Sequence, residues 1–315
     1  MKRRIAVGIG LGALAAFVAW LLVSYDFSLL AELPASTIAI LVALSVIYLA
    51  LYGVGIALIL RSLGAQRSLW RVYLVVSGAG TASYLGNFQL SVPVRLLLFN
   101  RLLDISYASG AASVALESVC WMVLMGAGLL LASASLDTLP WSVVIALLVL
   151  FCIALRYSIP ILRLLTRLTP GKLAGVSLQP AKTFAGDLIL ALTRVQPSWL
   201  LVATILFTLN YAIDAYSLSL VVSVYDEHLS LWEALRAVIL SYLAGLVTLI
   251  PMGLGVRDVS MVALLVKSGV SVDVATTATI VQRLLRTAIP LPLGFLSANL
   301  LGLREVLRRP TNPLP

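Results

Sequence analysis

The sequence predicts an all-α fold, a polytopic helical membrane protein with about six full crossings and two re-entrant helical hairpins in an inverted repeat. Of its 315 residues, 61% are hydrophobic and 11% are charged, and the mean hydropathy is +1.06. Soluble domains are roughly half apolar and about a quarter charged. The apolar runs are long enough to cross a bilayer, and basic residues are unevenly shared among the segments that connect them.

Long apolar runs mark the predicted full crossings, which lie at about residues 5–24, 37–60, 107–133, 141–157, 197–223 and 272–303. A helix of about 20 apolar residues spans the ~30 Å hydrocarbon core. The first run is longer than the apolar core of a signal peptide, so we interpret it as a retained helix, with cleavage as the alternative. Because no stretch is polar enough for an extramembrane domain, we expect residues 1–315 to form a single transmembrane domain.

The connecting segments differ in charge. Most lysines and arginines lie at the N-terminus, in residues 61–71, in residues 156–196 and in the C-terminal tail, whereas the alternate segments are acidic or neutral. The positive-inside rule then places both termini in the cytoplasm and the protein in the inner (plasma) membrane. The net charge of +9 is accordingly attributed to loops that face anionic lipid headgroups rather than to nucleic-acid binding.

This topology requires residues 72–104 and 233–269 each to enter and leave the membrane on the same side, since otherwise a strongly basic segment would be exported. We therefore predict re-entrant hairpins broken near Pro93 and Pro251. Proline removes a backbone donor and disfavours helix at the residue before it. Freed backbone groups are tolerated at membrane depth only inside protein or beside a water-filled cavity, so we expect these stretches to line a polar cavity.

The two hairpin segments resemble each other. Each contains Ser-Tyr-Leu and, nine residues after the tyrosine, the proline, and each is followed by a helix start rich in small residues. An odd number of predicted crossings separates the copies, so they enter from opposite sides. We infer repeat-like halves at about 72–133 and 233–303, a pattern common in transporters with a binding site near the midplane.

Polar, charged and glycine residues after the hairpin tyrosines form the predicted substrate-binding site for a lipid phosphate: Asn87, Arg95, Arg101, Glu117, Gly253, Gly255, Arg257, Asp258, Arg283 and Arg286. Glu117 and Arg283 lie at similar depth, ~15 Å into their predicted helices at 1.5 Å per residue. An uncompensated charge there costs ~2.5–3.5 kcal/mol. We therefore expect Glu117 and Arg283 to pair with each other across the pseudo-symmetry axis.

Two interpretations of these charges remain open. Arginine outnumbers carboxylate in the set, and guanidinium groups match phosphate oxygens bidentately, which favours an anion site. The alternative is a buried ionic lock between the repeats. Likewise Gly-Leu-Gly at 253–255 either presents backbone N–H groups to an anion or is a hinge. Asn210 and Asp214 share one helix face and either line the cavity or bond a neighbouring helix.

The stretches "GNFQLSVPVR" and "PMGLGVRD", with the helix that carries Glu117 and the later "QRLLR", resemble the lysylphosphatidylglycerol synthase transmembrane region, a flippase-like family. The positions that carry the resemblance are Asn87, Pro93, Arg95, Pro251, Gly253, Gly255, Asp258 and Arg283. Asp258 departs from the usual glutamate, and Ser118 stands where an arginine often follows the first-copy glutamate. The resemblance implies translocation of a phospholipid or a polyprenyl-phosphate-linked envelope precursor between leaflets.

Several functions remain in competition. A flippase or scramblase is the first, and a lipid-linked membrane transferase, a soluble-anion transporter and a non-transporting partner of an envelope enzyme are the alternatives. The sequence lacks D-x-D, H-E-x-x-H and G-x-S-x-G motifs and the soluble aminoacyl-transferase domain of the full synthases, so we expect no enzyme activity. We expect no metal, cofactor or nucleic acid, membrane lipids as partners, and envelope-biosynthesis enzymes as candidate protein partners.

Overall fold

The computed structural model describes residues 28–85, 91–133, 179–247 and 255–302, with isolated short pieces between residues 160 and 177. The predicted crossings at 5–24 and 141–157, and the site residues Asn87, Gly253 and Pro251, lie outside the described residues. Contacts divide the chain into two compact units. Unit 1 comprises residues within 1–50, 74–94 and 209–315, and unit 2 comprises residues within 51–73 and 95–208.

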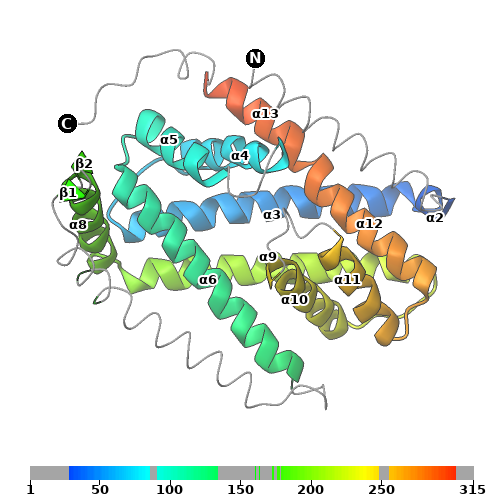
Figure 1. Ribbon diagram of the computed structural model, residues 1–315. Coiled ribbons are helices and arrows are strands. Elements are labelled where there is room, and N and C mark those ends of the chain that lie inside the picture. The colour runs from blue at the N-terminus through cyan, green and yellow to red at the C-terminus, as the bar shows by residue number, and fades with distance from the viewer. Residues whose placement is uncertain are drawn as a thin grey trace. The chain divides into compact units, whose positions relative to one another are not determined.

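The described residues are almost entirely helical (Figure 1). The helices are α2 (Ser28–Ala31), α3 (Ala35–Ser62), α4 (Leu69–Leu85), α5 (Ser91–Leu103), α6 (Tyr107–Ser133), α8 (Gln179–Thr193), α9 (Pro197–Ser223), α10 (Leu231–Val247), α11 (Val256–Lys267), α12 (Val272–Ala288) and α13 (Pro290–Leu300). One antiparallel pair of two-residue strands, β1 (Lys172–Leu173) and β2 (Val176–Ser177), is the exception. The helical class that the sequence predicts is confirmed for this part of the chain.

Three helices in the described part are long and apolar enough to cross a membrane: Ala35–Ser62, Tyr107–Gly126 and Pro197–Ser223. They coincide with the predicted crossings at 37–60, 107–133 and 197–223. Large apolar side chains on α3 and α9 point outward, for example Ile47 at 48% and Leu201 at 63% exposure. Outward-facing apolar side chains on helices of this length and hydropathy suit contact with lipid.

Each predicted hairpin segment contains a pair of helices, α4 with α5 and α10 with α11. Pro93 is the third residue of α5, where a helix N–H has no acceptor in its own helix, so the missing donor costs little. In unit 1, α11 packs against both α10 and α12 (Figure 1). Gly269, with φ +94°, provides the left-handed turn that lets α12 follow α11 closely.

The predicted crossing at 272–303 is two helices rather than one. α12 ends at Ala288, and α13 begins at Pro290, whose ring removes the backbone donor that a continuous helix would need. α13 then packs closely on α4 within unit 1. A Cβ at Gly294 would lie 2.6 Å from the Ser77 carbonyl oxygen, so this approach requires glycine.

Candidate functional site

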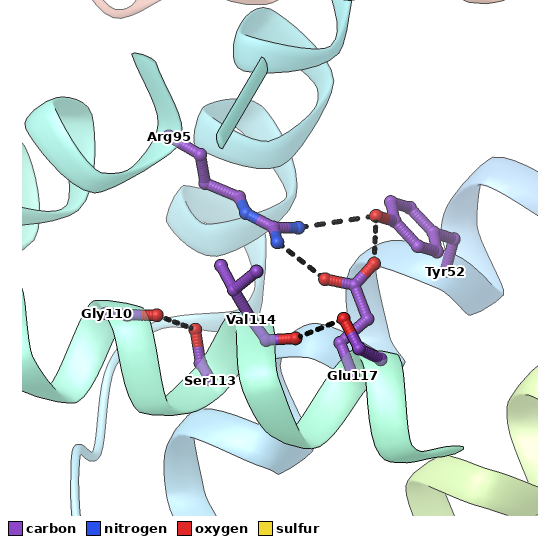
Figure 2. Close-up of polar contacts among 7 residues, drawn as sticks. Tyr52, Arg95, Gly110, Ser113, Val114 and Glu117 are labelled. Carbon is purple, nitrogen blue, oxygen red and sulfur yellow. Dashed lines mark hydrogen bonds and ion pairs between the residues drawn. The ribbon is translucent and has the colours of Figure 1, made fainter. Parts of the chain in front are cut away.

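A buried cluster in unit 2, here termed the first cluster, joins Arg95 of α5, Glu117 of α6 and Tyr52 of α3. Figure 2 shows the arginine and the tyrosine converging on the carboxylate. Arg95 Nη2 donates to Glu117 Oε2 at 2.5 Å, the Tyr52 hydroxyl donates to Oε1 at 2.5 Å, and Arg95 Nη1 donates to the Tyr52 oxygen at 3.3 Å. Arg95 and Glu117 are 7% and 8% exposed. Both carboxylate oxygens have donors, which offsets the cost of burying the charges.

The close packing of α5 on α6 positions the first cluster. A Cβ at Gly110 of α6 would lie 2.8 Å from Leu96 Cδ2 of α5, so the small residue permits this contact. Ser118, which follows Glu117, donates to the Val114 carbonyl at 2.9 Å within α6. Its hydroxyl is therefore satisfied by its own helix and adds nothing to the charge pair.

A second cluster lies in unit 1 and joins Arg286 of α12, Asp214 of α9 and Tyr48 of α3. Arg286 Nε donates to Asp214 Oδ1 at 2.8 Å, and Arg286 Nη2 contacts the same oxygen. The guanidinium carbon lies 3.2 Å from the centroid of the Tyr48 ring, a cation–π contact. Asp214 is 2% exposed, so this carboxylate is one of the most deeply buried charges in the described part of the chain.

A third charge pair, also in unit 1, joins α11 to α12. Arg283 Nη2 lies 3.2 Å from Asp258 Oδ2. Asp258 Oδ2 also accepts the Gly255 backbone N–H at 3.2 Å, and Gly255 has φ +82°, so the carboxylate caps the start of α11. The neighbouring Arg257 places its guanidinium carbon 3.8 Å from the centroid of the Tyr242 ring on α10.

Comparison with family models identifies the wider group. The model described as the lysylphosphatidylglycerol synthase TM region matches residues 5–294. The chain belongs to this family. The match includes all three charge pairs and both hairpin segments, and it confirms the resemblance seen in the sequence motifs. A search of curated proteins finds no match. Family membership places the protein among membrane proteins whose function concerns membrane lipids.

The predicted pairing of Glu117 with Arg283 is wrong. The structure gives each residue another partner, Arg95 for Glu117 and Asp258 for Arg283. Each partner comes from the helix that directly precedes in the chain, α5 or α11. The depth of the charges suggested a pair across the repeat, but the short connections at 104–106 and 268–271 bring charges together inside each copy.

The remaining predicted residues are placed as follows. Arg257 stacks on Tyr242, and Arg286 pairs with Asp214, so each contacts other groups of unit 1. The Gly255 N–H, which the sequence suggested would face an anion, donates to Asp258 instead. Arg101 lies near the end of α5, half-buried and six residues after Arg95.

Two half-open hollows, of about 250 and 400 Å³, lie among described residues of unit 2. Their linings include Arg61, Arg67 and Trp199, at the basic connection between α3 and α4 and at the start of α9. Neither of the two is lined by a predicted site residue. In this structure the arginines of the charge pairs form ion pairs with carboxylates of the same chain.

Sequence reasoning missed the tyrosines of the two clusters and left Asp214 undecided. Asp214 bonds a neighbouring helix, which was one of the two alternatives considered. Tyr48 and Tyr52 lie one helical turn apart in the apolar helix α3. Tyrosines in crossing helices usually lie at the membrane surface, so a pair well inside a spanning segment is the signal that would have found them.

Proposed function

We propose that the protein translocates a lipid with an anionic headgroup, a phospholipid or a polyprenyl-phosphate-linked envelope precursor, between the leaflets of the membrane. Charges at membrane depth are costly and mark substrate or ion pathways. The observation that carries the proposal is the set of arginine–carboxylate pairs held among apolar helices: Arg95–Glu117, Arg283–Asp258 and Arg286–Asp214. A family named for the membrane region of a lipid synthase supports a lipid as the substrate.

The Arg283–Asp258 pair is where we place the exchange with a phosphate. The Asp258 side chain is 28% exposed, against 11% for Glu117 and 2% for Asp214. Its carboxylate is therefore the most accessible of the three to a competing anion. A phosphate that replaces Asp258 offers the same acceptor geometry, so the guanidinium keeps an anionic partner while the headgroup passes.

The proposal includes the predicted topology, with six crossings, two re-entrant hairpins and both termini in the cytoplasm. The pairing of helices in each hairpin segment and the basic residues around Lys182 support it. A variant with the two native cysteines replaced allows labelling from outside intact cells. Lys182→Cys should stay unlabelled and Asp226→Cys should react with a membrane-impermeant maleimide. The reverse pattern would reject the topology.

Reconstituted liposomes containing fluorescent anionic lipid test the translocation itself. Arg283→Met should abolish lipid movement in a folded protein. The double variant Arg283→Met with Asp258→Leu removes both charges and discriminates between substrate binding and an ionic lock. A lock alone predicts that the apolar double variant keeps full activity, because replacing a buried pair by apolar residues is often neutral for stability. Arg194→Gln, at an exposed arginine, is the matched control.

The same vesicles separate the competing functions. A soluble phosphate ester trapped inside should remain inside if the substrate is a lipid, whereas its release would favour soluble-anion transport. We propose that the chain performs no covalent chemistry in this cycle and that lipids are its principal partners. Recovery of chemically altered lipid after incubation would favour a transferase instead.

A further inference from the structure

Asn210 is a buried amide without a partner at the centre of a spanning helix. It lies thirteen residues from either end of α9 and is 0% exposed. Neither its Nδ2 nor its Oδ1 has a hydrogen-bond partner among the residues that the structure describes. An asparagine amide offers two donor hydrogens and an acceptor oxygen, and burying them unpaired is strongly unfavourable. Such a group requires an explanation in a native protein.

Gln282 of α12 is a second amide of the same kind. It is 5% exposed, and its Nε2 has no hydrogen-bond partner in the described part of the chain. Asn210 precedes Asp214 by one helical turn on α9, and Gln282 precedes Arg286 by one turn on α12. Because Asp214 and Arg286 are bonded to each other, both open amides flank one charge pair in unit 1.

Neighbouring polar side chains on these two helices are satisfied. The Ser217 hydroxyl donates to the Ile213 carbonyl at 2.7 Å, and the Thr279 hydroxyl donates to the Ala275 carbonyl at 2.8 Å. Short hydroxyl side chains can bond the preceding turn of their own helix, whereas amides do not do so here. The amides of Asn210 and Gln282 are therefore open although nearby hydroxyl groups on the same two helices are bonded.

Building on the proposed translocation, we propose that Asn210 and Gln282 recognise a hydroxyl group on the lipid headgroup, beside Arg286. A phosphodiester oxygen accepts hydrogen bonds and has none to donate, so it cannot satisfy Asn210 Oδ1. A hydroxyl both donates and accepts, and can satisfy the two open groups of one amide. The substrate class is then an anionic lipid with a hydroxylated headgroup, such as a glycerol, inositol or sugar ester.

Full burial of Asn210 means that the headgroup reaches the site only when the surrounding helices separate. A carrier that alternates between two states provides such an opening. In this structure the amides are closed off, and the Asp214–Arg286 pair holds the charge. The unpaired amides make the closed state energetically less favourable. Substrate supplies the missing hydrogen bonds when it binds, so it has a higher affinity for the open state than for the closed one.

Two anionic lipids of equal charge test this site. Phosphatidylglycerol carries headgroup hydroxyls and phosphatidylmethanol does not, and their binding is compared on the full chain in nanodiscs by fluorescence titration. We expect the native protein to prefer phosphatidylglycerol by about tenfold, because a site built for a hydroxyl rejects an analogue that lacks it. Asn210→Leu should remove that preference. It should not lower the unfolding temperature, because an unpaired buried amide is replaced by an apolar group.

Ser217→Ala is the matched control, since its hydroxyl is bonded inside α9, and it should keep the preference. Gln282→Leu is the second variant, and it should reduce the preference even if Asn210→Leu fails to fold. The proposal is overturned if the native protein does not discriminate, or if both folded amide variants keep the preference. Binding is measured without transport, so a protein that discriminates but moves no lipid would refute translocation while leaving the hydroxyl site standing.

Discussion

The two predicted hairpin segments of this chain begin with similar sequences but differ in the charge at the fourth position. α4 starts within Ser-Leu-Trp-Arg (68–71) and α10 within Ser-Leu-Trp-Glu (230–233), and both helices are 17 residues long. Arg71 in the first copy thus corresponds to Glu233 in the second. An arginine at the first start and none at the same position of the second fits the positive-inside rule if the proposed copies enter from opposite sides.

The reversal continues at the charge pairs. In the first copy the arginine is on the half-helix, Arg95 of α5, and the carboxylate is Glu117 on the next helix. In the second copy Asp258 is on the half-helix α11 and Arg283 is on the next helix. Each copy therefore neutralises its buried charge internally. Both copies pair an arginine with a carboxylate, but the two charges follow each other in opposite order along the chain.

The clusters also differ in how completely they are satisfied. Both oxygens of Glu117 receive donors in the first cluster, where Arg95 Nε is left without a partner among the described residues. In unit 1, the open amides of Asn210 and Gln282 flank the Asp214–Arg286 pair. A carboxylate bonded through both oxygens contributes mainly to stability, whereas an amide with both of its groups open is suited to bind something else. We therefore expect variants of the first cluster to affect folding and variants of unit 1 to affect transport.

The largest effect should come from Glu117→Leu, which leaves Arg95 buried without its anion. We expect a loss of about 3–5 kcal/mol in the free energy of unfolding, measured by denaturant titration in detergent. Asp258→Leu in the second copy should cost less, because Asp258 is more exposed. The double variant Arg95→Met with Glu117→Leu should recover most of the loss. If Glu117→Leu were no worse than Asp258→Leu, the contrast between the copies would fail.

The tyrosines allow a finer comparison. Tyr52→Phe removes the hydroxyl that donates to Glu117, so we expect a loss of about 1.5–3 kcal/mol, as for hydrogen bonds to charged groups. Tyr48 presents its ring face to Arg286, and phenylalanine keeps that face. Tyr48→Phe should therefore change stability by less than about 0.5 kcal/mol, whereas Tyr48→Leu should cost about 1–2 kcal/mol. Equal losses for the two Tyr→Phe variants would show that the rings have the same role.

Apolar periodicity and length predicted much of the fold. The crossings at 37–60, 107–133 and 197–223 coincide with α3, α6 and α9 because a long apolar helix is specified locally. The predicted crossing at 272–303 is divided at Pro290, a break that the high hydropathy of this run did not reveal although proline directly indicates it.

The site was less predictable because partners are set by packing. Charges in apolar segments identified Arg95, Glu117 and Arg283 from the sequence. Which arginine pairs with which carboxylate depends on how the helices pack, for example on the contact between α5 and α6 beside Gly110. Asn210 was noticed as polar, but only the structure shows that both of its hydrogen-bonding groups are unpaired.

Reversing the second copy tests whether complementarity alone matters. The double variant Asp258→Arg with Arg283→Glu gives that copy the charge order of the first. It should cost only about 1–2 kcal/mol of stability, because the pair is restored while the carboxylate that accepts the Gly255 N–H is lost. Arg283→Glu alone places two carboxylates together and should cost more. Thermal unfolding followed by circular dichroism compares the stability of the native protein, the single variant and the double variant. A double variant no better than the single one would mean that each copy requires its own order.

The smallest effect concerns the starts of the two hairpins. Ser230 Oγ accepts the Glu233 N–H at 3.2 Å, and Glu233 Oε2 accepts the Ser230 N–H at 3.0 Å, a reciprocal cap that the first copy cannot form because Arg71 stands in place of the glutamate. Ser230→Ala should cost about 1 kcal/mol of unfolding free energy. Ser68→Ala, at the equivalent position of the first copy, is the control and should be nearly neutral.

This cap should also make the second hairpin sensitive to acid. Hydrogen bonds from Ser230 lower the pKa of Glu233, which lies in the first turn of α10, outside the spanning helices. Because the folded pKa is below the unfolded one, the stabilisation is complete above the unfolded pKa, about 4.3, and is lost as the pH falls through the folded pKa. Stability measured from pH 7 down to pH 3 should therefore fall less in Ser230→Ala than in the native protein. Ser68→Ala should follow the native curve, and an identical acid response in both variants would refute the role of the cap.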